Sequence, residues 1–142
     1  MADLMTMFGY DETTAESGVK MILGANPATE YAVICRYGNK NYDRVLTKVM
    51  QDNNKALELL KTVDPEAYNK KNRELVAEVV AKTVFVELGP GITVNGKKVD
   101  NTWEARRDIL LLPTDFYSKV VEFSQDKSNY PVKKDVEEIK KP

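Results

Sequence analysis

The fold class is decided by residues 31–42, which read YAVICRYGNKNY. Their first half, residues 31–37, is short, apolar and rich in β-branched and aromatic residues, which is typical of a strand. A similar run at residues 19–23 precedes it, and the turn-forming residues 24–27 lie between the two, so the pair predicts a β-hairpin. After Gly38 the apolar spacing becomes that of a helix. The sequence therefore predicts an α+β chain, with an N-terminal hairpin followed by a mainly helical domain.

Helical spacing continues well beyond the strand region. Apolar residues recur three and four apart on one face, at Tyr42, Val45, Leu46, Val49 and Met50. The polar run at residues 52–54 interrupts that face before it resumes, so one helix or two short helices fit the pattern. Asp64 and Pro65 then start another helix, because proline lacks the N–H that is unpaired at the first helical position. We expect this helix to continue through the β-branched run up to Val86 and to end near residues 88–91.

The last part of the chain alternates turns with short helices. Asn95 and Gly96 tolerate the positive φ angles of a tight turn, so we expect a small second hairpin or a structured loop over residues 92–99. A short helix that ends at Pro113 follows, and a final helix fails at residues 129–131. The candidate caps are Asn101 or Thr102 for the first helix and Thr114 or Asp115 for the second.

These elements predict a single α+β domain over residues 18–130. Residues 1–17 carry four acids, no base and little periodic apolar spacing, so we expect an acidic arm that is mobile or loosely docked. Leu4, Met7 and Phe8 are the residues that could anchor it to the domain. Residues 131–142 form a tail of mixed charge.

Composition excludes much chemistry and several classes of partner. Across 142 residues, 21 Lys plus Arg oppose 22 Asp plus Glu, and the net charge of −1 argues against nucleic acid. The chain has no His and only one Cys, Cys35, which removes the imidazole proton shuttle, an intramolecular disulfide and the usual zinc ligand sets. Residues 1–10 do not resemble a targeting signal, and apolar runs such as residues 109–112 are far too short to cross a membrane. We expect no cofactor and no metal.

No residue pattern indicates catalysis. The glutamates lie among lysines on expected solvent faces, and Cys35 falls in a strand with no His to activate it. Residues 89–91, Gly-Pro-Gly, lack the spacing of a phosphate-binding loop. The basic and aromatic residues at 36–44 would suit single-stranded nucleic acid, but the nearly neutral charge of the chain favours a helix start with inward-facing tyrosines.

Two stretches read together resemble the tail assembly chaperones of tailed bacteriophages. The first stretch runs from Glu16 through residues 31–42 to Leu46. The second covers residues 79–130 and includes residues 110–117, which read LLLPTDFY. The resemblance thus spans residues 16–130. The chain departs from the family at residues 86–88, where members often carry a tryptophan, and at Cys35, where they often carry an alanine.

The resemblance implies a non-enzymatic protein of the host cytoplasm that binds the long tape measure protein and helps to recruit tail tube protein. Self-association is compatible with this role. The family also often makes a longer form by ribosomal frameshifting, for which codons at Lys140 and Lys141 are candidates. The candidate partner contacts are Trp103, Phe116, Tyr117, Val120 and Phe123, although each of them also suits the domain core. The alternative function is a small structural virion protein of the tail or connector.

Overall fold

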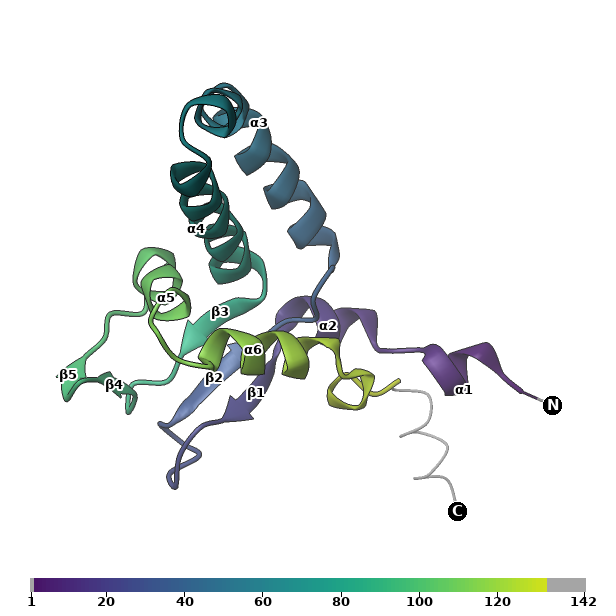
Figure 1. Ribbon diagram of the computed structural model, residues 1–142. Helices are drawn as coiled ribbons and strands as arrows, with labels where there is room; N and C mark the ends of the chain where they lie inside the picture. The colour runs from purple at the N-terminus through teal and green to yellow at the C-terminus, as the bar shows by residue number, and fades with distance from the viewer. Residues whose placement is uncertain (1, 133–142) are drawn as a thin grey trace, which may run out of the picture.

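The computed structural model describes residues 2–132 as a mixture of helices and short antiparallel strands (Figure 1). The helices are α1 (Leu4–Phe8), α2 (Glu12–Ser17), α3 (Lys40–Val63), α4 (Pro65–Thr83), α5 (Trp103–Leu110) and α6 (Phe116–Gln125), followed by the 3₁₀ turn η1 (Lys127–Asn129). The strands are β1 (Val19–Ile22), β2 (Tyr31–Ile34), β3 (Phe85–Leu88), β4 (Thr93–Val94) and β5 (Lys97–Lys98). This mixture confirms the predicted α+β class.

The main sheet has three antiparallel strands, with β2 between β1 and β3. β2 is shorter than residues 31–37 because the backbone after Ile34 bonds to three other segments. Cys35 N–H donates to the carbonyl of Val84 at 2.7 Å, Arg36 N–H to that of Ala15 at 2.9 Å, and Tyr37 N–H to that of Ser124 at 3.2 Å. The exit of β2 therefore holds three parts of the chain together.

The end of α4 corrects one expectation. The helix does not continue to Val86 but ends at Thr83, and Phe85–Leu88 forms β3 against β2. Val84 and Phe85 are both fully buried at this change. β-Branched and aromatic residues favour a strand when a pairing partner is present, and β2 supplies that partner from more than 50 residues earlier. Both segments carry residues that favour strands, but the contact that pairs them joins positions far apart in the sequence.

α3 and α4 form a long helical hairpin that rises from the sheet (Figure 1). The polar run at residues 52–54 does not break α3, and Asn53 donates from its side chain to the Val49 carbonyl at 2.8 Å. The structure thus selects one helix over two. At the tip, Asp64 caps α4 by accepting from Ala67 N–H at 3.2 Å, and Pro65 occupies the first turn.

Part of the N-terminal segment, from Asp11 onward, packs against the domain. Asp11 N–H donates to the Tyr130 carbonyl at 2.9 Å, and Ala15 in α2 is only 2% exposed. For residues 11–17 the structure thus shows a docked segment, which is one of the two possibilities that the sequence left open for residues 1–17. Two of the acids have local partners that the sequence did not reveal, since Asp11 caps α2 and Glu12 pairs with Lys40 at 2.7 Å. α1, in contrast, projects from the domain (Figure 1).

The last described helix and the residues after it attach to the sheet. α6 ends at Gln125, and Tyr130 is fully buried after η1. Its hydroxyl donates to the Ile34 carbonyl at 2.9 Å, which attaches this end of the chain to β2. Most of the predicted charged tail, with Lys140 and Lys141, lies outside the described residues.

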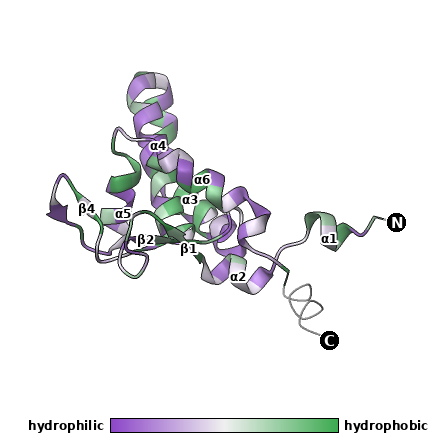
Figure 2. Ribbon diagram, turned by 90° about the horizontal axis from the view of Figure 1, so that it is seen from below, coloured by the Kyte–Doolittle hydropathy of each residue, from purple (hydrophilic) through white to green (hydrophobic). Residues whose placement is uncertain are grey.

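The core lies where α4 packs on the sheet, and hydrophobic residues concentrate there (Figure 2). Its fully buried members come from β2, α4, β3 and α6, and include Ile34, Val79, Val80, Phe85 and Val120. Each side chain of this size stabilises the fold by about 1.5–3 kcal/mol through burial. α5 and the β4–β5 hairpin extend from this core and create the concave surface described next.

Candidate binding groove

The predicted contact residues do not form one patch. Val120 is fully buried in the core, so the expectation that it touches a partner is wrong in this fold. Trp103 is half-buried at the start of α5, with Lys82 Nζ 4.2 Å and Arg107 Cζ 5.2 Å from its ring centroid. Phe123 lines a separate depression together with Met21 and several polar residues of the C-terminal segment.

Tyr117 belongs to a cluster of tyrosines between α6 and the start of α3. The Tyr37 and Tyr42 hydroxyls are 2.8 Å apart, and their ring centroids are 4.7 Å apart. Burial raises the pKa of Tyr117 above its ordinary value, and burial followed by the Tyr37 hydrogen bond raises that of Tyr42. Tyr42 and Tyr117 therefore stay neutral at pH 7, and this cluster packs the two helices together.

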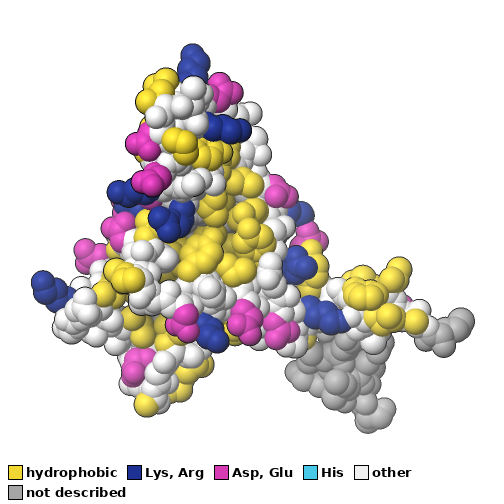
Figure 3. Space-filling view, in the orientation of Figure 1, with side chains coloured by type: hydrophobic (Ala, Val, Ile, Leu, Met, Phe, Trp, Pro, Cys, Tyr) yellow, Lys and Arg dark blue, Asp and Glu magenta, His cyan; other side chains and the backbone are white. Residues whose placement is uncertain are grey.

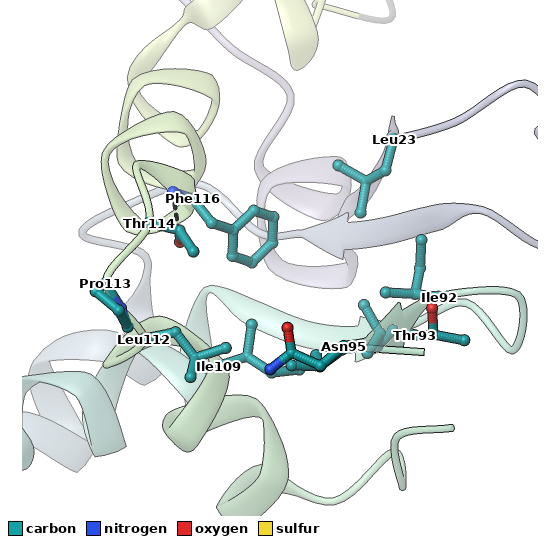
Figure 4. Close-up of a pocket in the computed structure, with 11 residues that line it drawn as sticks. Leu23, Ile92, Thr93, Asn95, Ile109, Leu112, Pro113, Thr114 and Phe116 are labelled. Carbon is teal, nitrogen blue, oxygen red and sulfur yellow. Dashed lines mark hydrogen bonds between the residues drawn. The ribbon is translucent and has the colours of Figure 1, made fainter. Parts of the chain in front are cut away.

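Among the five predicted contact residues, Phe116 is the one that lines a sizeable apolar groove. Figure 4 shows it reaching from the start of α6 toward a space framed by the turn after β1, the β4–β5 hairpin and the end of α5. The groove has a volume of about 570 Å³. Its apolar lining consists mainly of Leu23, Leu88, Ile92, Ile109, Leu112 and Phe116.

Local sequence shapes each wall of this groove. Asn95 and Gly96 have φ of 52° and 78°, which closes the β4–β5 hairpin along one side. Thr114 Oγ1 accepts from Phe116 N–H at 3.2 Å and so starts α6 just after Pro113. The Phe116 ring packs edge-on against Phe85, with centroids 5.3 Å apart, so part of this side chain is anchored in the core.

A buried arginine fixes α5, and sequence reasoning missed this role. Arg106 is 8% exposed and donates to the carbonyls of Phe85 at 2.8 Å and Ala81 at 3.1 Å. It also donates to the Asn101 side-chain oxygen at 2.9 Å, and that oxygen accepts from Leu88 N–H at 3.1 Å. The network joins α4, β3 and α5 beneath the groove. The sequence signal for this role was a basic residue, Arg106, among the apolar residues of a short helix.

Sequence reasoning also missed most of the groove itself. Leu23, Leu88 and Ile92 come from turns and a strand end, where no period marks them as a shared surface. Leu112 follows α5, and neither the helix end before Pro113 nor the motif at residues 110–117 marks it as part of a groove wall. These residues meet through the packing of segments far apart in the sequence.

The groove can bind apolar groups but has no acid–base chemistry. No acidic or basic side chain is found among the groove-lining residues within the part of the chain that the structure describes. Across residues 2–132, no cluster of Cys, Asp and Glu could hold a metal ion. Cys35 is buried, and burial raises the pKa of its thiol to about 11, so the nucleophilic thiolate is scarce at pH 7.

A second apolar surface lies between α3 and α4, above α6. Figure 3 shows hydrophobic side chains gathered there, within a border of charged residues. Half-buried apolar residues of α3 and α4, such as Val45, Leu46 and Val76, pack against the core. This surface thus continues the core outward.

Comparison with family models, with curated proteins and with solved structures finds no match to this chain. Within residues 2–132, no helix is long and apolar enough to cross a membrane. The structure therefore defines this chain as an α+β fold carrying an apolar groove, and its function is inferred from that groove and from the sequence.

Proposed function

We propose that this chain is a non-enzymatic tail assembly chaperone that holds an apolar segment of a partner in the groove. By the sequence resemblance, the partner is a phage tape measure protein in the host cytoplasm, onto which tail tube protein is recruited. The observation that carries the proposal is that the LLLPTDFY motif at residues 110–117 supplies Leu112, Pro113, Thr114 and Phe116 to the groove lining. The residues that suggest the family are thus residues that shape the binding surface.

The dimensions and chemistry of the groove suit part of an amphipathic helix. A volume of about 570 Å³ falls within the range of small-ligand sites and admits several apolar side chains. Helices dock in such grooves through apolar residues spaced three and four apart, and a tape measure protein is long and hydrophobic. The absence of charge in the lining removes any cost of burying an unpaired ion.

The affinity should be moderate, which suits a chaperone that later leaves. Each buried side chain of the partner contributes about 1.5–3 kcal/mol, but association and ordering offset much of the sum. We therefore expect dissociation constants on the order of micromolar for single segments.

The test is binding of purified tape measure protein segments to this chain and to two matched variants. Leu112→Asp places a carboxylate in the groove lining, outside the core cluster. Leu59→Asp makes the same chemical change on α3, where the leucine is 65% exposed. We expect at least a tenfold loss of affinity for Leu112→Asp and less than a twofold change for Leu59→Asp.

Equal affinities for the two variants would refute the groove as the binding site. The same phage supplies a test of the alternative function. A chaperone is absent from purified virions, whereas a structural tail or connector protein is present at a fixed number of copies.

A further inference from the structure

The first helix exposes apolar side chains that its own domain does not cover. Leu4, Met7 and Phe8 are spaced three and four apart on α1, and they are 72%, 42% and 64% exposed. Lys127 Nζ lies 5.5 Å from the centroid of the Phe8 ring, and this contact leaves most of the ring in solvent. Figure 3, in the orientation of Figure 1, shows hydrophobic side chains gathered at the end of the molecule where α1 lies. Such a cluster costs solubility unless another surface covers it.

The α1 helix cannot reach the groove of its own chain. Only three residues separate α1 from α2, and within that link Asp11 N–H is held by the Tyr130 carbonyl. The Arg36 guanidinium also lies 3.9 Å from the centroid of the Tyr10 ring, which fixes the base of α1. Figures 1 and 2 both place α1 at the end of the molecule opposite the β4–β5 hairpin that borders the groove. Any groove that α1 fills must belong to another molecule.

The groove and α1 are complementary in chemistry. Both are apolar, and α1 presents three neighbouring side chains to a cavity of about 570 Å³. The rim of the groove carries charge of both signs, because the exposed Lys97 and Lys98 of β5 line the adjoining depression together with Asp100 and Asp108. The match between α1 and the groove therefore rests on their apolar side chains.

We propose that α1 of one copy inserts Leu4, Met7 and Phe8 into the groove of a second copy. The contact is head-to-tail, because each molecule gives its helix to one neighbour and its groove to another. A contact of this kind produces rings or open chains rather than a closed dimer. One consequence rests on the proposed function. An apolar partner segment must displace α1 from the groove, so self-association and partner binding exclude each other.

The test is sedimentation equilibrium of the full chain and of variants that disable one half of the contact. The helix variant carries Leu4→Ser and Phe8→Ser, both at exposed positions. The groove variants are Leu112→Asp and, on the opposite wall, Leu23→Asp; both residues lie outside the core cluster, so folding is retained. Leu59→Asp is the control.

We expect the average mass of the unaltered chain and of the control to rise with concentration. Each disabled variant should associate at least tenfold more weakly, since burying one such side chain changes a dissociation constant by about that factor. An equimolar mixture of the helix variant and a groove variant retains one intact helix and one intact groove. That mixture should form a complex of two chains and nothing larger.

Three results would overturn the proposal: an unaltered chain that stays monomeric at submillimolar concentration, groove variants that associate normally, or a mixture that stays monomeric. Association of the groove variants would show α1 packing against α1 instead. Partner binding separates this proposal from the proposed function. If the helix variant binds a tape measure segment no tighter than the unaltered chain, displacement is refuted. If Leu112→Asp stops self-association but leaves partner binding unchanged, only the proposed function fails.

Discussion

Replacing Arg106 by Met tests how the wall of the groove is held. Arg106 donates to the Ala81 and Phe85 carbonyls, at 3.1 and 2.8 Å, in a buried setting. Ala81 lies in the last turn of α4, whose terminal carbonyls have no partner within the helix, so the guanidinium acts as a cap there. Burial lowers the pKa of Arg106 from its ordinary value, yet the group stays charged at neutral pH.

The expected cost follows from the groups left without donors. A buried carbonyl that loses its hydrogen-bond donor costs about 1–3 kcal/mol, so two of them cost about 2–6 kcal/mol. The methionine side chain fills much of the space and regains about 1 kcal/mol through apolar contact. We therefore expect Arg106→Met to lower the free energy of unfolding by about 3 kcal/mol.

Urea unfolding followed by circular dichroism measures this loss as a shift of the midpoint at constant slope. Arg107→Met is the matched control, because Arg107 is the next residue of α5. Within the described chain, its one salt bridge joins it to the exposed Asp108 at 3.0 Å. Its cost should be within about 0.5 kcal/mol. A loss below about 1 kcal/mol for Arg106→Met would show that other donors satisfy these carbonyls, and the reasoning above would be wrong.

Three further predictions concern other parts of the domain. Tyr130→Phe removes the hydroxyl that bonds the Ile34 carbonyl, and urea unfolding should show a loss of about 1.5 kcal/mol; an unchanged midpoint would contradict this. Gly18→Ala should cost at least about 2 kcal/mol, because Gly18 has φ 94° and ψ 160° and a Cβ would lie 2.5 Å from Val33 Cγ1. Gly96→Ala, at φ 78° with nothing within 4 Å, should cost about 1 kcal/mol, and equal losses would refute the role of Val33. Stability should fall as pH rises above about 9, because the Cys35 thiol ionises there in the unfolded chain, whereas burial raises its pKa to about 11 in the folded chain. Urea midpoints measured from pH 7 to 10 test this, and the Cys35→Ala control should lack this part of the pH dependence.

Local patterns were sufficient for most helices and turns. Asp64 and Pro65 start α4, Asn95 and Gly96 close the second hairpin, and Thr102 caps α5 by accepting from Ala105 N–H at 3.2 Å. Each of these features depends on residues within about four positions of one another. Short-range hydrogen bonds and fixed backbone angles determine them, so they can be predicted from sequence.

The candidate site was predicted only in part. Phe116 lines the groove, whereas Val120, one turn further along α6, is buried in the core. Helical spacing places both residues near the same face, and it does not say which end of that face another segment covers. The remaining lining residues, such as Leu23 and Ile92, have no local signal because they lie in turns.

The sequence by itself determined the α+β class, several caps and turns, and the absence of His and of a second Cys. Composition and near-neighbour spacing are local properties, and they do not depend on how the chain folds back on itself. Only the tertiary structure decided that Phe85–Leu88 joins the sheet, that α2 docks on the domain, and that Arg106 fixes α5. It also decided that a groove exists opposite an exposed α1. These features arise from contacts between residues far apart in the chain, whose free energy is gained only when the whole domain is assembled.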